Sequence, residues 1–369
     1  MSHFNVTQLL LFSNYQIIKE IPDTKNNCYI ISSDHSDLCF LKVFTNHTSA
    51  QVEYSLINYL WEYTTQLNVN NKFEFSVPQI LELLENEQNI GLVYKYVNGK
   101  TASQLLFESN NNPFYICNKL IKATAQIHWL ISSNRKIIGL NPITPIYFSP
   151  SNDCQKRLED LLILEGKEIL SVSQLTCLLD LQSAFFDILY QKADGFPCDY
   201  YKDANPANWI FQARNEKIVA VDFEGDRSVP FFVDLINILE YAANYLDVDQ
   251  KSTLINKYIK MRIKLEPNLK PILEQYNLDL LLSLFGIYRH QEQMAHRLRD
   301  IKAQEKTREW HIQGFQYHLK AFSIHIQLIT KNNYLNISQK KVLLNYNNEV
   351  RKIYVEIFPK LLKYSSISK

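Results

Sequence analysis

The chain has 369 residues and a mass of 43.3 kDa, a length that allows two or three domains or one two-lobed unit. Hydrophobic residues make up 46% and charged residues 21%, which is ordinary for globular proteins and excludes disordered and fibrous classes. Lysine and arginine (39) nearly balance aspartate and glutamate (38), so we expect no nucleic-acid partner. The 8 glycines are too few for a glycine-rich loop that binds phosphate.

The cysteines and the apolar segments indicate a soluble, cytoplasmic protein. The six cysteines are scattered and form no CxxC pair, so reduced thiols are expected rather than disulfides or a zinc site. The N-terminus lacks the basic region of a signal peptide. The most apolar long stretch, residues 229–246, contains Asp234, Asn237 and Glu240, which would be costly in lipid. We therefore expect no membrane partner.

The first hundred residues are rich in predicted strands. Three short runs with β-branched and aromatic residues fill residues 15–44 and are separated by turn-forming segments. A helix is predicted over 50–63, from apolar residues at helical spacing. Two more strand-like runs, FSVPQILELLE and NIGLVYKYV, follow it. Thr101 and Gln104 then form a capping box that begins the next helix.

The rest of the chain is predicted to be mostly helical. Helices are expected over 114–132, 155–169, 173–191 and 231–246, with several more toward the C-terminus. One β-rich island, at 208–222, interrupts them. The order indicates an α+β fold with a small β-rich lobe, residues 1–97, a hinge and a larger helical lobe, residues 98–369.

Lys42 is the first residue that suggests chemistry. In the segment FLKVF it is the single charge in an otherwise apolar run, and a buried ammonium needs a partner to keep its proton. Glu53 is a candidate partner, because it lies on the apolar side of the following helix, with Ile57 and Leu60 at helical spacing. In the alternative interpretation, Lys42 reaches solvent from an edge strand and Glu53 is solvated.

Three polar side chains follow in a second region. Asp203 and Asn208 stand in a D-x-x-x-x-N arrangement within a loop that contains proline, and Asp222 ends the next strand. This spacing predicts that three oxygen-bearing side chains meet at the ends of two neighbouring strands. Carboxylate and amide oxygens suit Mg²⁺, which keeps its other positions for water and phosphate. In the alternative interpretation these residues are present only because Asp and Asn are common in turns.

Together, and in this order, these segments resemble the aminoglycoside phosphotransferase and choline kinase superfamily, whose fold is protein-kinase-like. The resemblance covers about residues 15–245. FLKVF resembles the strand with the nucleotide-binding lysine, VEYSLINYL the helix that supplies its glutamate, and FSVPQILEL with GLVYKYVNG the hinge segment. IKATAQIHWL resembles the helix that ends in Leu-His, and we expect its His128 to be a packed helix-end residue.

The remaining motifs carry the site residues. The segment from Asp203 to Asn208 matches the catalytic loop, VDFEGD matches the metal-binding motif with Asp222, and VDL matches the structural Asp234. The resemblance thus implies a bilobal kinase-like enzyme. It would transfer the γ-phosphoryl group of ATP to a hydroxyl of a small molecule such as a sugar, amino sugar, aminoglycoside or amino alcohol.

The resemblance also implies roles for these residues. Lys42, held by Glu53, would bind the α- and β-phosphates, and Asp203 would orient the acceptor hydroxyl and take its proton. Asn208 and Asp222 would hold Mg²⁺. Adenine would bond to the backbone of the hinge, near Lys95 and Val97.

Two departures from the family pattern keep an inactive pseudokinase or scaffold open as the alternative. Tyr201-Lys202-Asp203 replaces the usual His-Gly-Asp, and the nucleotide loop near residues 23–28 has no glycine. Phosphorylation of a protein substrate is a further alternative, but the short interval from Asp222 to Asp234 leaves no room for an activation loop.

The acceptor is not identified by sequence. Segment 287–300 places Arg289, Gln293 and Arg297 on one helical face. It is either a solvated face or a site that binds a sugar-like or anionic acceptor. A cationic acceptor would instead need acidic groups, for which the candidates are Glu224, Asp226 and Glu240.

Overall fold

A computed structural model describes most of the chain, in two compact units. The described residues are 6–10, 13–21, 27–34, 37–66, 73–86, 89–140, 147–149, 154–212, 218–223, 227–241, 246–303 and 308–366. The first unit combines Met1–Thr144 with Asp199–Pro267, and the second combines Pro145–Cys198 with Asn268–Lys369. The predicted lobe boundary after residue 97 lies inside the first unit and stays a prediction.

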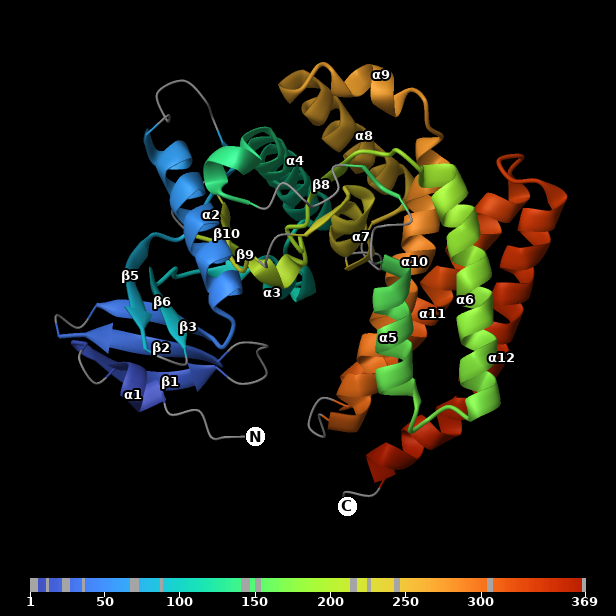
Figure 1. Cartoon of the computed structure of the whole chain (residues 1–369), viewed down its shortest axis with the longest axis horizontal. Helices are drawn as coiled ribbons and strands as arrows, with labels where there is room; N and C mark the ends of the chain where they lie inside the picture. Colours follow the sequence, from blue (N-terminus) through green and yellow to red (C-terminus); the bar gives the residue numbers. More distant parts are fainter. Residues whose placement is uncertain are drawn as a thin grey trace. The chain divides into compact units, whose positions relative to one another are not determined.

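The first unit begins with a five-stranded antiparallel sheet of order β1-β2-β3-β6-β5 (Figure 1). Its strands are β1 (Tyr15–Ile21), β2 (Asn27–Ser33), β3 (Leu38–Phe44), β5 (Ile80–Glu85) and β6 (Ile90–Lys95). The predicted strands are therefore confirmed. Strand β3 lies in the middle of the sheet, between β2 and β6, so Lys42 is not on an edge strand. A short helix, α1 (Val6–Leu10), packs its apolar side chains against the sheet.

Helix α2 (His47–Gln66) packs against strands β3, β5 and β6. Its beginning is fixed by Asn46, whose side chain accepts a hydrogen bond from the backbone of Ser49 at 3.1 Å. One face of the helix, formed by Glu53, Leu56, Ile57 and Leu60, is at most 3% exposed. Helical spacing thus buries a carboxylate among aliphatic side chains, where it needs a cation or hydrogen-bond donors.

The rest of the first unit consists of two smaller sheets and the helices that pack around them. One sheet has the order β4-β10-β9-β7 and the other pairs β11 with β8. The elements are β4 (Phe75–Ser76), β7 (Lys100–Thr101), α3 (Ala102–Phe107), α4 (Pro113–Ile138), β8 (Cys198–Tyr200), the 3₁₀ turn η1 (Pro206–Asn208), β9 (Trp209–Phe211), β10 (Ile218–Ala220), β11 (Ser228–Pro230), α7 (Phe232–Tyr241) and α8 (Val248–Leu265). The predicted β-rich island is confirmed, and so is the capping box of Thr101 and Gln104.

Helix α4 is the buried centre of this region and packs against α7 and α8. Its His128 is fully buried and bonds to the Tyr258 hydroxyl at 2.7 Å and to Asp234 Oδ2 at 3.0 Å. The imidazole therefore joins three helices. The prediction that His128 is a packed residue is confirmed, but its predicted position at a helix end is wrong, because α4 continues to Ile138.

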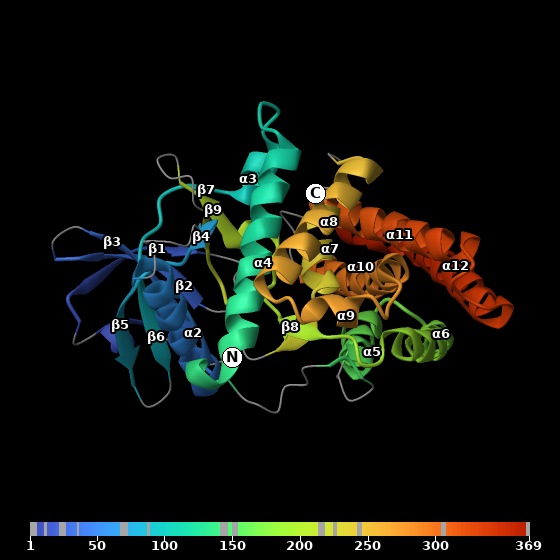
Figure 2. The ribbon, with the colours of Figure 1, turned by 90° about the horizontal axis from the view of Figure 1, so that it is seen from above.

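The second unit is helical (Figure 2). Its helices are α5 (Cys154–Gly166), α6 (Val172–Ala193), α9 (Leu269–Leu273), α10 (Leu278–Ala303), α11 (Arg308–Lys331) and α12 (Ile337–Ser366). The α10–α11 pair makes the most extensive contact between elements, and α12 packs on α11 and α6. Across the described part of the chain, every helix is too short or too polar to traverse a lipid bilayer.

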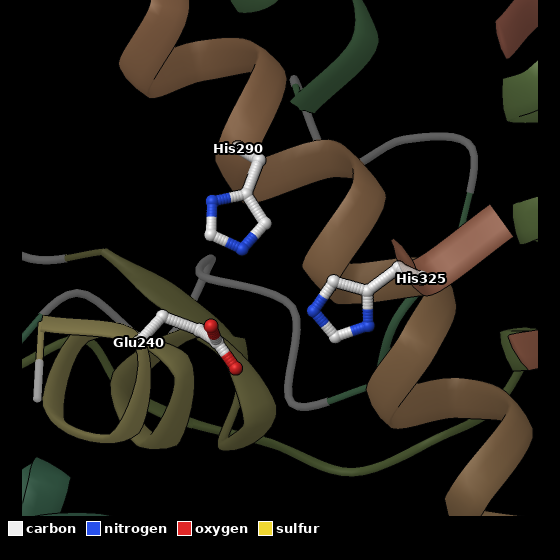
Figure 3. Close-up of side chains that lie close together, drawn as sticks. All are labelled: Glu240, His290 and His325. Carbon is white, nitrogen blue, oxygen red and sulfur yellow. The ribbon is translucent and has the colours of Figure 1, made fainter. Parts of the chain in front are cut away.

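Histidines lie buried where α10 crosses α11. The rings of His290 and His325 stack with centroids 5.4 Å apart (Figure 3), and His290 Nδ1 lies 3.0 Å from His318 Nδ1. Gly286 makes the crossing possible, because a Cβ there would lie 2.5 Å from His325 Nε2. Glu240, also drawn in Figure 3, belongs to α7 of the first unit, where it accepts a hydrogen bond from Lys251 at 3.3 Å.

These buried histidines predict that the protein loses stability in mild acid. Burial lowers the pKa of His296 to about 4, and burial together with His290 lowers the pKa of His318 well below its usual value. The unfolded chain, with ordinary histidines, then binds more protons below about pH 6.5. We expect the free energy of unfolding to fall by at most about 1.4 kcal/mol per pH unit for each histidine between that pH and the folded-state pKa.

Urea unfolding at pH 7 and pH 5 tests this expectation. His296→Gln should reduce the loss of stability between these pH values, whereas His47→Gln, at an exposed histidine of the first unit, should leave it unchanged. An identical pH dependence in wild type and His296→Gln would show that His296 is not responsible.

Candidate functional site

A cavity of about 600 Å³ lies in the first unit. Its walls include the apolar side chains of Ile57, Pro78 and Ile210, which suit a flat aromatic base. Six of the seven residues proposed from the sequence line it: Lys42, Glu53, Lys95, Val97, Asn208 and Asp222. The structure thus brings together residues that are up to 180 positions apart in the chain.

Lys42 is the electrostatic centre of this cavity. It is 5% exposed, and its Nζ donates to Glu53 Oε2 at 2.8 Å and to Asp222 Oδ1 at 2.5 Å. Burial alone lowers the pKa of Lys42, but the carboxylates of Glu53 and Asp222 outweigh this effect and hold it above the usual lysine value. The interpretation of Lys42 as a solvent-reaching residue, with Glu53 solvated, is therefore wrong, and Lys42 is a permanent cation.

Tyr94 is part of the same network and was missed by the sequence analysis. Its hydroxyl, on β6, donates to Glu53 Oε1 at 2.7 Å, so both oxygens of the buried carboxylate have donors. Burial, followed by the charge of Glu53, raises the pKa of Tyr94 well above its usual value, which keeps the hydroxyl protonated. The chain has 22 tyrosines, and no local pattern distinguishes this one.

The hinge presents backbone groups to the cavity. The amide of Lys95 donates to Gln79 O at 2.9 Å, and that of Tyr96 donates to Leu38 O at 3.3 Å. Among the described residues no hydrogen bond to the backbone of Val97 is found. Val97 lines the cavity, and its contact with a bound base stays a prediction.

Asp203 lies in the loop before η1 and is held by three side chains. Tyr201 Oη and Asn237 Nδ2 donate to its Oδ1 at 3.0 and 3.1 Å, and Asn208 Nδ2 lies 3.3 Å from its Oδ2. The backbone of Asp203 has a positive φ of 52°, a conformation that aspartate tolerates better than most residues. The loop therefore fixes both the position and the orientation of the carboxylate.

Asp234, at the beginning of α7, anchors this loop. It is fully buried, and its carboxylate accepts from the backbone amides of Lys202 and Ala204, at 3.0 and 2.7 Å, as well as from His128. An acidic residue in the first turn of a helix is also favoured by the helix dipole. These contacts give Asp234 a structural role.

Tyr201 replaces the histidine of the family pattern and Asn237 supports it. The Asn237 amide lies 3.5 Å from Tyr201 Oη as well as 3.1 Å from Asp203 Oδ1. The sequence marked Asn237 only as a polar residue in an apolar stretch, because a contact between positions 203 and 237 has no local signature.

Asn208 and Asp222 together form a donor set that fits Mg²⁺. The Nδ2 of Asn208 donates to Asp203 O at 3.0 Å, which leaves its amide oxygen as a ligand atom. The Asp222 side chain is 36% exposed, whereas Lys42 and Glu53 beside it are buried. Accessible carboxylate and amide oxygens are the ligands that hard divalent cations prefer.

Two sequence expectations lie outside the described residues. Residues 23–26 of the predicted nucleotide loop, 23–28, are not described, and neither are Glu224 and Asp226. The described end of that loop is the beginning of β2, where Cys28 lines the cavity.

The polar face of α10 is packed within the second unit. Arg289 is 7% exposed and donates to Glu292 at 2.5 Å. Arg297 bonds to His311 Nδ1 at 2.8 Å and covers the ring of Trp310. The interpretation of this segment as a solvated face is wrong, because Arg289 is buried beside Glu292 of the same helix, while His311 and Trp310 of α11 pack on Arg297. Whether the face contacts an acceptor stays a prediction.

Comparison by sequence finds neither a matching family model nor a matching curated protein, but comparison by structure finds similar folds. Amicoumacin kinase hAmiN, solved with AMP-PNP, Ca²⁺ and Ami, aligns over 94% of this chain and 92% of its own, with 13% identity and a TM-score of 0.55. APH(2")-IIia, solved with GDP and kanamycin, aligns over 86% and 97%, with 11% identity and a TM-score of 0.53.

A GDP complex of a mutant aminoglycoside 2'-phosphotransferase aligns over 88% of this chain and 98% of its own, with 11% identity and a TM-score of 0.51. At these identities the alignments establish the fold. They confirm the α+β architecture, and the proteins with this fold include aminoglycoside phosphotransferases, the group that the motifs resemble. The chain has the protein-kinase-like fold of the aminoglycoside phosphotransferases.

Proposed function

We propose that this protein transfers the γ-phosphoryl group of ATP to a hydroxyl group of a small molecule. The observation that carries the proposal is the Lys42–Glu53–Asp222 network at one cavity, with Asp203 bonded to Asn208 beside it. Phosphoryl transfer requires this combination of a cation, metal-binding oxygens and a carboxylate near the acceptor. The structures with a similar fold include an amicoumacin kinase and an aminoglycoside phosphotransferase bound to kanamycin, which supports a small-molecule acceptor.

Each residue of the network has a separate role in this reaction. Lys42 binds the α- and β-phosphates, while Glu53 and Tyr94 keep its ammonium in place. Asn208 and Asp222 would hold Mg²⁺, which would supply positive charge to the phosphate oxygens. The protein contributes position and charge neutralisation, and little covalent chemistry.

Asp203 acts on the acceptor, and the hinge binds the base of the nucleotide. The Asp203 carboxylate orients the acceptor hydroxyl and takes its proton. The hydrogen bonds from Tyr201 and Asn237 stop the carboxylate from turning away. The hinge backbone near Lys95 and Val97 bonds to the adenine base, with Val97 as the donor, because the Lys95 N–H already donates to Gln79 O.

A screen for ATP consumption tests the proposal. Purified protein is incubated with ATP, Mg²⁺ and panels of sugars, amino sugars, aminoglycosides and amino alcohols, with Asp203→Asn as the matched inactive control. We expect at least one panel to stimulate ATP consumption in the wild type only. If no acceptor is phosphorylated and ATP still binds in a Mg²⁺-dependent way, the non-catalytic alternative replaces the enzyme.

Tyr201→Phe is expected to lower turnover about tenfold without changing nucleotide affinity. The substitution removes a hydrogen bond to a carboxylate, worth roughly 1.5–3 kcal/mol, and Asn237 retains part of the orientation. Steady-state kinetics with the best acceptor measure the effect, and Tyr200→Phe, at the neighbouring buried tyrosine, is the control. Unchanged turnover in Tyr201→Phe would show that the hydroxyl does not position Asp203.

A further inference from the structure

Lys202 is a buried cation directly beside the proposed catalytic aspartate. Its side chain is fully buried in the first unit, and its Nζ lies 4.5 Å from the ring centroid of Phe223 and 5.3 Å from that of Trp209. Among the described residues it forms no direct ion pair with a carboxylate. Burying an ammonium costs free energy unless hydrogen bonds and nearby charges compensate. The hydrogen bonds that Lys202 makes therefore indicate what its burial achieves.

The hydrogen bonds of Lys202 are made to backbone oxygens on both sides of Asp222. Nζ donates to Val221 O at 2.8 Å and to Asp222 O at 3.1 Å. These carbonyl groups belong to the two peptide planes that flank the Cα atom of Asp222. Because φ and ψ are rotations of those planes about that atom, a single ammonium bonded to both oxygens restrains both angles.

The restrained conformation is an uncommon one. Asp222 has a φ of 61°, and Asp203 is the other described non-glycine residue with a positive φ. Such a conformation costs an L-residue free energy and persists where surrounding contacts enforce it. Here it accompanies the direct contact of Asp222 Oδ1 with Lys42 Nζ.

We propose that Lys202 is a positioning residue that fixes the backbone of Asp222 and thereby aims its carboxylate at the metal and phosphate site. The inference rests on the proposed function, since it assigns Asp222 to Mg²⁺. It adds a residue that the family pattern does not supply, because the pattern has glycine, without a side chain, at this position. The same residue also ties the Asp203 loop to helix α7, since its backbone N–H donates to Asp234 Oδ2.

The charge of Lys202 is secondary to its hydrogen bonds in this account. Burial lowers the pKa of Lys202, although Asp222, Asp203, Asp234 and Glu53 counteract part of that effect. An ammonium and a neutral amine both carry at least two N–H donors, so either form can bond to the two carbonyl oxygens. The variant that separates the two effects is Lys202→Gln, whose amide keeps two N–H donors without the charge.

The test compares nucleotide binding with and without Mg²⁺ by calorimetry. The quantity compared is the ratio of ATP affinity with Mg²⁺ to ATP affinity without it. For Lys202→Met, which removes the donors, we expect this ratio to be about tenfold smaller than in wild type, the effect of losing hydrogen bonds of ordinary strength. For Lys202→Gln we expect less than a threefold loss. Affinity for ATP without Mg²⁺ should remain within about threefold of wild type in both, because Lys42 and the hinge are untouched.

The outcomes separate the inference from the proposed function. Lys119→Met, at a lysine that bonds to Glu74, controls for the loss of a partly buried lysine. If both Lys202 variants keep the wild-type response to Mg²⁺, or if Lys202→Gln loses as much as Lys202→Met, the positioning role is refuted. If Lys202→Met does not fold, Lys202→Ala, which also lacks the donors, takes its place, and the same comparison with Lys202→Gln decides. If wild type itself shows no response to Mg²⁺, the proposed function fails and this inference fails with it.

Discussion

Asp222→Asn is expected to abolish most of the Mg²⁺-dependent tightening of nucleotide binding, with a loss of about 100-fold or more. Asp222 is the anionic member of the proposed metal-binding pair, and Asn208 is neutral. Asparagine is the informative replacement, because it tolerates the positive φ of 61° that Asp222 adopts. The backbone should therefore persist while the charge disappears.

Calorimetric titration of ATP, with and without Mg²⁺, measures this effect. Glu74→Gln is the control, because Glu74 is also a lysine-bonded carboxylate of the first unit but contacts Lys119 and Lys122 instead of Lys42. Full retention of the Mg²⁺ response in Asp222→Asn would mean that Asp222 serves only as the counter-charge of Lys42. The melting temperature should change little, because Lys42 keeps its bond to Glu53.

The elements of the fold could be predicted because their signals are local. Alternating and helical patterns, the capping box at Thr101 and turn residues between apolar runs each operate within a few residues of one another. Lys42 and Glu53 stood out for the same reason, as isolated charges on apolar faces. The structure confirms that they are buried and paired.

The partners of the site residues could not be predicted from local patterns. Tyr94 meets Glu53 across 41 positions of the chain, and Asn237 meets Asp203 across 34. Neither is distinguished from the other tyrosines or asparagines by its neighbours in sequence. Such contacts arise only when a helix and a strand, or a helix and a loop, are packed together.

Helix α10 shows a different limit, because its polar pattern left a solvated face and an acceptor site as alternatives, and the first of them is wrong. Arg289 and Arg297 are spaced like residues of a solvated face, yet each has a partner within the second unit. Polar residues indicate solvent only when no second polar face covers them. For Arg297, α11 supplies that face, and Gly314, where a Cβ would lie 3.0 Å from Arg297 Nε, permits the close approach.

Asp203→Asn separates an active phosphotransferase from an inactive protein of the same fold. If Asp203 orients the acceptor and takes its proton, turnover should fall about 10²–10⁴-fold. ATP and Mg²⁺ binding should persist, because the proposed ligands are Asn208 and Asp222. The amide is nearly isosteric and tolerates the positive φ of 52° at this position.

The measurement needs an acceptor from the screen, or the slow hydrolysis of ATP to water if none is found. The amide can still accept hydrogen bonds from Tyr201 and Asn237 through its oxygen, so the loop should keep its structure while proton transfer is lost. A fall in turnover at constant ATP affinity therefore assigns the chemistry to Asp203. A parallel fall in affinity would mean that Asp203 supports the nucleotide site instead. Equal ATP hydrolysis by both proteins, with no acceptor phosphorylated, would contradict the catalytic assignment, because a base that contributes to turnover cannot be replaced by an amide without loss.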